Sequence, residues 1–164
     1  MKKMTALILV LALAALTVCS ALADSRIAPP AFADLEQDPY AVEKTRVEEP
    51  NAAKENSGTV TISMTDTMKL DHENELIEMM YEHAFDSTHA AVCQIIINVN
   101  GEEILLAQSG VIPAGYGLYR MDALPDTHRL QEGYHSVTLR LLFYDPATGV
   151  RADFNTDIPA YLLA

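Results

Sequence analysis

Disulfide bonds cannot stabilise this chain, because only two cysteines, Cys19 and Cys93, occur among its 164 residues. Cys19 falls in an apolar N-terminal segment that secretory processing removes or lipidates, which leaves Cys93 without a partner within the chain. Apolar residues surround Cys93 in the sequence, and we expect it to be a small buried hydrophobic residue rather than a reactive thiol. Stability must therefore come from an apolar core.

Positive charge is also scarce. The chain has 11 lysines and arginines against 23 aspartates and glutamates, so its formal net charge is −12. Such a negative surface repels nucleic acid and anionic membrane surfaces. After the N-terminal segment, no apolar run is long enough to span a bilayer. We therefore expect no nucleic-acid partner, and contact with a membrane only through a signal peptide or a lipid on Cys19.

Catalytic and metal-binding motifs are missing as well. The chain contains no HExxH zinc motif, no GxSxG nucleophile elbow and no phosphate-binding glycine loop. Asp71, Glu73 and Glu75 resemble the start of a calcium loop, but the glycine that such a loop requires is absent. We predict no catalytic residue, no metal and no cofactor. The alternative is a metal-dependent hydrolase with ligands from the His72–His89 region. All five histidines are interpreted as solvated surface side chains, namely His72, His83, His89, His128 and His135.

The N-terminus has the features of a secretory signal peptide over residues 1–23. Two lysines precede an apolar run from Thr5 to Val18, and Ala21-Leu22-Ala23 provides a small-x-small cleavage site. A second route competes, because the sequence LTVC that ends at Cys19 is similar to a bacterial lipobox, although valine stands where a small residue is usual. Cleavage after Ala23 would secrete the protein. A lipid on Cys19 would attach it to the outer face of the cytoplasmic membrane as an accessory lipoprotein.

Residues 24–57 have the composition of a linker. They contain four prolines and eight acidic against four basic residues, but few large apolar side chains. Burial of so little apolar surface would not offset the entropy that ordering costs, so the segment is predicted to be disordered or loosely docked. It would separate the signal peptide from a folded domain over residues 58–164, and would act as a spacer if Cys19 carried a lipid.

A series of short strands is predicted for the remainder. Apolar and polar residues alternate in most of them, while the run at Ile95-Ile96-Ile97 is typical of a central strand buried on both faces. The segment 71–85 is ambiguous: a strand over 76–81 is favoured, and a helix capped by Asp71 is the alternative. Pro159 indicates that this end of the last strand lies at a sheet edge. The other predicted strands are 59–64, 90–98, 103–108, 118–123, 134–144 and 151–162.

Three connections carry turn signals. Asn100-Gly101 predicts a type I′ hairpin turn, because both residues tolerate a positive φ. The residues 145–149 predict a second hairpin turn. Between these hairpins, the stretch 109–125 cannot begin as a regular strand, because Pro113 lacks an N–H and Gly115 permits backbone angles that other residues avoid. We predict that this stretch carries the chain from one sheet to the other.

The same stretch holds the candidate binding residues. Tyr116, Tyr119 and Arg120 follow the turn, and tyrosine and arginine are frequent anchors of protein interfaces. The alternative is that one tyrosine covers the edge of the core while the glycines only form the turn. If the three residues bind, the expected partner is another cell-surface or envelope protein.

Several of these segments together resemble a known group of proteins. The segments 109–115 and 130–134 and the turn at Tyr144-Asp145 resemble small exported immunoglobulin-like proteins and lipoproteins of Gram-positive bacteria, many of which have no assigned activity. The resemblance covers residues 90–158 and implies an all-β, immunoglobulin-like antiparallel β-sandwich of about seven strands. It also implies that Gly133 forms the turn before Tyr134, and that the Tyr134 hydroxyl hydrogen-bonds to the upstream backbone. The expected function is a non-catalytic binding or structural module at the bacterial cell surface.

Overall fold

The computed structural model describes residues 26–45 and 62–164. The predicted signal peptide, the lipidation candidate Cys19 and the start of the predicted strand 59–64 lie outside these ranges. Within them the chain is all-β, as predicted, and no helix there is both long and apolar enough to cross a membrane. The elements are η1 (Phe32–Asp34), β1 (Ala41–Glu43), β2 (Ile62–Met64), β3 (Thr67–Asp71), β4 (Leu76–His83), β5 (Ala90–Val99), β6 (Glu102–Gln108), β7 (Tyr116–Asp122), η2 (Pro125–Arg129), β8 (Tyr134–Tyr144) and β9 (Arg151–Leu163).

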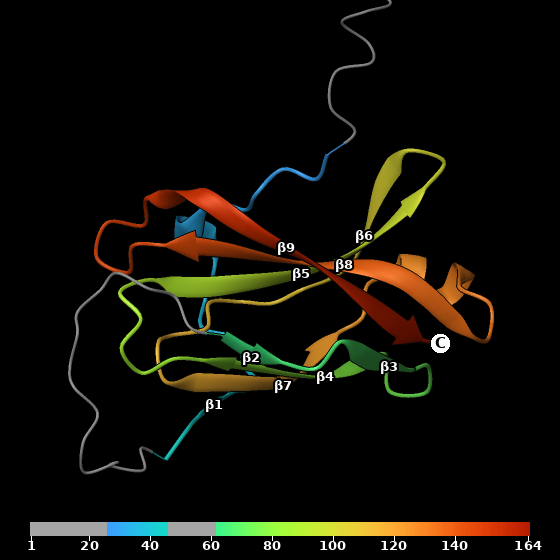
Figure 1. The fold of residues 1–164 in the computed structure, drawn as a ribbon, viewed down its shortest axis with the longest axis horizontal. Helices are drawn as coiled ribbons and strands as arrows, with labels where there is room; N and C mark the ends of the chain where they lie inside the picture. The colour runs from blue at the N-terminus through green and yellow to red at the C-terminus, as the bar shows by residue number, and fades with distance from the viewer. Residues whose placement is uncertain (1–25, 46–61) are drawn as a thin grey trace, which may run out of the picture.

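The described strands form one curled sheet (Figure 1). Their order is β1-β7-β4-β3-β9-β8-β5-β6, and β2 also pairs with β4. The curl places β6, β5, β8 and β9 over β7, β4 and β2. β3 joins the two halves, because it pairs antiparallel with β4 at residues 69–71 and parallel with β9 at residues 67–69. The nine strands exceed the predicted seven because the sequence pattern missed β1 and β3.

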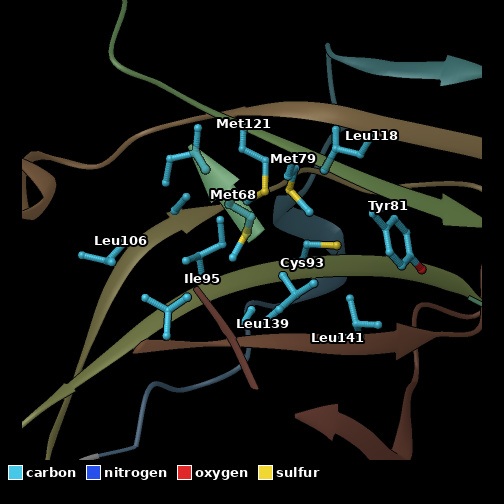
Figure 2. Packing of buried hydrophobic residues seen from close by; sticks show 14 of the residues in the cluster. Met68, Met79, Tyr81, Cys93, Ile95, Leu106, Leu118, Met121, Leu139 and Leu141 are labelled. Atoms are coloured by element: carbon cyan, nitrogen blue, oxygen red, sulfur yellow. The ribbon is translucent and has the colours of Figure 1, made fainter. Parts of the chain in front are cut away.

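The main core fills the space between the two halves (Figure 2). Methionines from β3, β4 and β7, Met68, Met79 and Met121, lie across from Ile95 of β5 and Leu139 of β8. Methionine suits such a position, because its unbranched side chain adapts to irregular gaps between sheet halves. A core of this kind is held by shape and apolar contact alone, as the scarcity of cysteine requires.

β5 is the central strand that the sequence predicted. It lies between β6 and β8, and its side chains are buried on both faces over residues 90–96. Ala91 and Cys93 point into the main core, whereas Val92 belongs to a second, outer cluster with Leu142 and Tyr144 of β8. This outer cluster would be exposed to water if nothing covered the sheet there.

The first part of residues 26–45, which we call the strap, covers that cluster. For these residues this corrects the prediction of a disordered or loosely docked linker over 24–57; residues 46–57 of that prediction lie outside the described ranges. η1 places Phe32 on the outer cluster, with its ring centroid 5.3 Å from that of Tyr144. The Tyr144 hydroxyl donates a hydrogen bond of 2.8 Å to the carbonyl of Pro30. The backbone N–H of Ile27 donates to the Glu103 carboxylate at 3.0 Å. Each contact lies on the outer face of the β5–β8 half.

The strap then crosses to the other half at Asp38. The Asp38 side chain is only 5% exposed, and its carboxylate accepts hydrogen bonds of 2.8 Å from the N–H groups of Tyr40 and Gly110. Directly after this anchor, β1 pairs antiparallel with β7. A few well-placed residues therefore dock a segment whose average composition is that of a linker.

The stretch 109–125 is the predicted crossover, since it leaves β6 in one half and enters β7 in the other. Its glycines are required by close approach. A Cβ on Gly110 would stand 2.6 Å from the Glu36 carbonyl oxygen of the strap. Gly115 has a φ of +83°, and a Cβ there would stand 2.7 Å from the Phe85 ring. The Pro113 carbonyl closes the turn by accepting the Tyr116 N–H at 3.2 Å.

The type I′ turn and the strand in the ambiguous segment are confirmed. Asn100 and Gly101 have φ values of 56° and 90°, so both are left-handed as that turn requires. β4 occupies the segment for which a helix was the alternative. Asp71 caps no helix; its carboxylate accepts the N–H groups of Glu73 and Asn74 in the turn between β3 and β4.

Two predictions near the end of the chain are wrong. Pro159 predicted a sheet edge, but β9 lies between β3 and β8 in the sheet, and residues 161–163 at its end pair with both neighbours. The hydrogen-bonded tyrosine corner is wrong: Tyr134 is 70% exposed, and its hydroxyl has no hydrogen-bond partner among the described residues. The corner is held instead by Gly133, which exchanges two backbone hydrogen bonds of 3.0 Å with Ala164.

Candidate functional site

The structure separates the three predicted binding residues. Tyr119 and Arg120 lie exposed on β7, whereas Tyr116 is half-buried and packs against the main core. Neighbouring strand residues normally point to opposite faces. Here the β4–β7 register shifts by one residue between the pairs Glu78/Arg120 and Tyr81/Leu118. This β-bulge leaves two adjacent side chains, Tyr119 and Arg120, on the surface together.

Tyr119 lies over the backbone of Gly117. A Cβ at Gly117 would stand 2.8 Å from the Tyr119 hydroxyl oxygen, so a larger residue there would displace the ring. The hydroxyl donates a hydrogen bond of 3.2 Å to Glu82 of β4. Partial burial and this hydrogen bond raise the pKa of Tyr119. The ring is therefore fixed on the sheet while 42% of the side chain remains exposed.

The strap adds a cation and one apolar side chain to the site, and Phe85, which follows β4, adds a second apolar one. Lys44 lies 3.7 Å from the Glu82 carboxylate and 5.2 Å above the centroid of the Phe85 ring. Val42 of β1 stands opposite Gly117 in the register of β1 and β7. Val42 is 54% exposed and Phe85 41% exposed. Because the sequence reading placed Val42 and Lys44 in a linker, no local signal predicted that they would join Tyr119.

A second aromatic–cation pair lies farther along β7. The Arg120 guanidinium lies 4.7 Å above the centroid of the Tyr40 ring, and the Tyr40 hydroxyl donates to Asp122 at 2.8 Å. The hydrogen bond to Asp122 raises the pKa of Tyr40. We call this surface the β7 face and define it by Tyr40, Val42, Lys44, Glu82, Phe85, Tyr119 and Arg120.

The histidines do not converge on a metal site. No group of three or more histidine, cysteine or acidic side chains within residues 26–45 and 62–164 is placed to hold an ion. His72 lies in the β3–β4 turn and His83 at the opposite end of β4, and an eight-residue strand spans roughly 23 Å. His72 is therefore far from His83 and from His89, whose carbonyl His83 contacts, so these three histidines do not share one site.

His83 is buried, which corrects its prediction as a surface residue. It is fully inaccessible; the Tyr81 hydroxyl donates to Nδ1 at 2.9 Å, and Nε2–H donates to the His89 carbonyl at 2.8 Å. Burial lowers the pKa of His83 and favours this neutral form. The alternation of Ile77, Met79 and Tyr81 on the inner face of β4 includes position 83, and this signal could have found it.

Cys93 is buried as predicted, and burial raises the pKa of its thiol. One polar cluster was missed. Arg140 of β8 binds Glu103 through two hydrogen bonds of 3.0 and 2.9 Å and Asp157 through two of 2.9 and 3.0 Å. These bonds to Arg140 lower the pKa of both carboxyl groups. Because Arg140 binds both carboxylates at once, the cluster acts as a structural staple between β6, β8 and β9.

Comparison with known proteins found no relative: no protein family, curated protein or solved structure matches the chain.

Proposed function

We propose that this chain is an exported, non-catalytic binding module of the immunoglobulin-like class that acts at the bacterial cell surface. Its strand order supports the class. β3, β4 and β7 take the places of strands A, B and E of an immunoglobulin-like sandwich, and β5, β6, β8 and β9 those of C, C′, F and G. β1 and β2 are additions to the β4–β7 half.

The observation that carries the binding function is the β7 face. Three large apolar side chains, Val42, Phe85 and Tyr119, stay between 41% and 54% exposed on it. Single exposed apolar residues are ordinary, but a contiguous group bordered by charges is typical of an interaction surface. Tyrosine and arginine at the centre of such a surface are the residue types that most often carry binding energy.

The β7 face is also held in place before any partner arrives. Glu82 fixes Tyr119 and Lys44, and Tyr40 fixes Arg120 by stacking. Side chains that are already ordered lose little rotamer freedom on binding, so more of the contact energy becomes affinity. A folded protein of the cell envelope, with its own preformed surface, is the partner that such a rigid face fits.

A quantitative pull-down from solubilised envelopes of the producing bacterium tests this proposal. We expect the wild-type protein to retain one defined envelope protein, and the double variant Tyr119→Ser/Arg120→Ser to bind it at least tenfold more weakly, as loss of hot-spot residues predicts. The matched control Tyr134→Ser/Arg129→Ser removes an exposed tyrosine and arginine outside the β7 face. Equal retention by all three proteins would show that the β7 face does not bind.

Export rests on residues 1–23, and the mass of the mature N-terminus tests it. A chain that begins at Asp24 supports secretion, and a diacylated Cys19 supports attachment to the membrane. An intact Met1 on cytoplasmic protein would contradict export. If Cys19 is lipidated, the docked strap leaves only the segment up to Arg26 as a tether, which reaches at most about 25 Å. The domain would then lie close to the membrane rather than on a long spacer.

A further inference from the structure

An apolar groove lies between the strap and the turn that joins β8 to β9, on the opposite half of the sheet from the β7 face. Its volume is about 660 Å³, which is in the range of small-molecule sites. The strap contributes Pro29, Pro30 and Phe32, and the other wall is formed by Tyr144, Pro146 and Arg151. Such a lining of rings and aliphatic carbons favours a flat apolar ligand.

The polar groups of the turn are satisfied within the turn itself. The Asp145 carboxylate accepts the N–H groups of Ala147 and Thr148 at 2.8 and 3.1 Å. The Tyr144 hydroxyl is engaged with Pro30. These groups fix the shape of the groove but have their own partners, so they contribute little to ligand recognition.

Arg151 differs from them. It is exposed at the rim, directly opposite Tyr144 in the register of β8 and β9. Its positive charge acts on the Tyr144 hydroxyl, because it opposes the rise in pKa that burial causes there. Within the described part of the chain, the Arg151 guanidinium makes no ion pair or hydrogen bond. An unpaired cation is notable in a chain of net charge −12, where acidic side chains outnumber basic ones two to one.

We propose that this groove binds a small organic carboxylate with a flat apolar body, seated against Phe32 and Tyr144 and paired through its carboxylate with Arg151. A guanidinium forms charge-assisted, bidentate hydrogen bonds with a carboxylate, and the apolar walls contact the body of the ligand. The ligand would bridge the strap and the β8–β9 turn. This site is independent of the β7 face, because no residue is common to both.

Titration followed by amide NMR shifts tests the site, with 4-phenylbutyrate as the carboxylate probe and 4-phenylbutyramide as its neutral analogue. We expect saturable shifts at the amides of Phe32, Gly149 and Arg151, and roughly tenfold weaker binding of the neutral analogue, which lacks the charge-assisted bond. Arg151→Gln should reduce the affinity for the carboxylate to that of the analogue. Arg129→Gln, an exposed arginine elsewhere, should leave it unchanged.

The fold of each variant is compared by its thermal midpoint, which a change at an exposed arginine should not move. Equal affinity for the two probes, or an Arg151→Gln variant that binds the carboxylate like the wild type, would overturn the proposal. Shifts confined to amides outside the groove, or no saturable shift, would overturn it as well. None of these outcomes bears on the β7 face, whose partner is tested separately.

Discussion

Replacing Asp38 by alanine tests whether the strap is an integral part of the fold. The carboxylate accepts two part-buried N–H groups, from Tyr40 and Gly110, at 2.8 Å each. A hydrogen bond to a charged group contributes about 1.5 kcal/mol or more, and the variant loses both. We therefore expect the free energy of unfolding to fall by about 3 kcal/mol.

Urea denaturation at pH 7 measures this loss. Asp38→Asn keeps one acceptor oxygen without its charge, so it should lose about half as much. The matched control is Asp153→Ala, an exposed aspartate for which the change should stay within about 0.5 kcal/mol. If Asp38→Ala were as stable as Asp153→Ala, the strap would add nothing to the stability of the domain, and the account of its docking would be wrong.

Three further predictions concern single residues. Gly115→Ala should destabilise the fold by about 1–3 kcal/mol, because its φ is +83° and the Phe85 ring occupies the space of a Cβ; a neutral effect in urea denaturation would contradict this. Arg140→Met should lower the free energy of unfolding by about 3 kcal/mol, because it removes the guanidinium that pairs with Glu103; a variant as stable as the wild type would contradict the role of Arg140 as a staple. Burial lowers the pKa of His83, so its contribution to stability is present above the unfolded pKa of about 6.5 and is lost as the pH falls below it, by up to about 1.4 kcal/mol per pH unit. The wild type should therefore lose more stability between pH 7 and 5 than His83→Gln, and equal losses would show that His83 does not titrate with folding.

The sequence pattern predicted the strands in which apolar and polar residues alternate over five residues or more. β5 and β8 followed from their apolar runs, and the Asn100-Gly101 turn followed from the tolerance of both residues for positive φ. β1 and β3 were missed because each is short and lies beside charged residues, so its pairing depends on distant strands. The strap was missed for a related reason: average composition hides the few residues, Phe32 and Asp38 among them, that dock it.

The candidate site was predictable only in part. Tyr119 and Arg120 were found from residue type, but their joint exposure depends on the β-bulge opposite them, which no local pattern encodes. Lys44 and Phe85 reach the same surface from the strap and from the end of β4, and only the fold brings them together. At Tyr134 a sequence signal was misleading. The turn before it suggested a hydrogen-bonded corner, but the structure leaves its side chain exposed.

Site-specific photocrosslinking in living cells tests the central claim most directly. A benzoyl-phenylalanine at position 119 places the probe on the β7 face, and the same probe at position 134 places it on an exposed position outside that face. We predict that position 119 crosslinks to one envelope protein, identified by mass spectrometry, and that position 134 does not. A probe at position 119 that captures no protein, or the same proteins as position 134, would contradict the proposal that this chain binds through the β7 face.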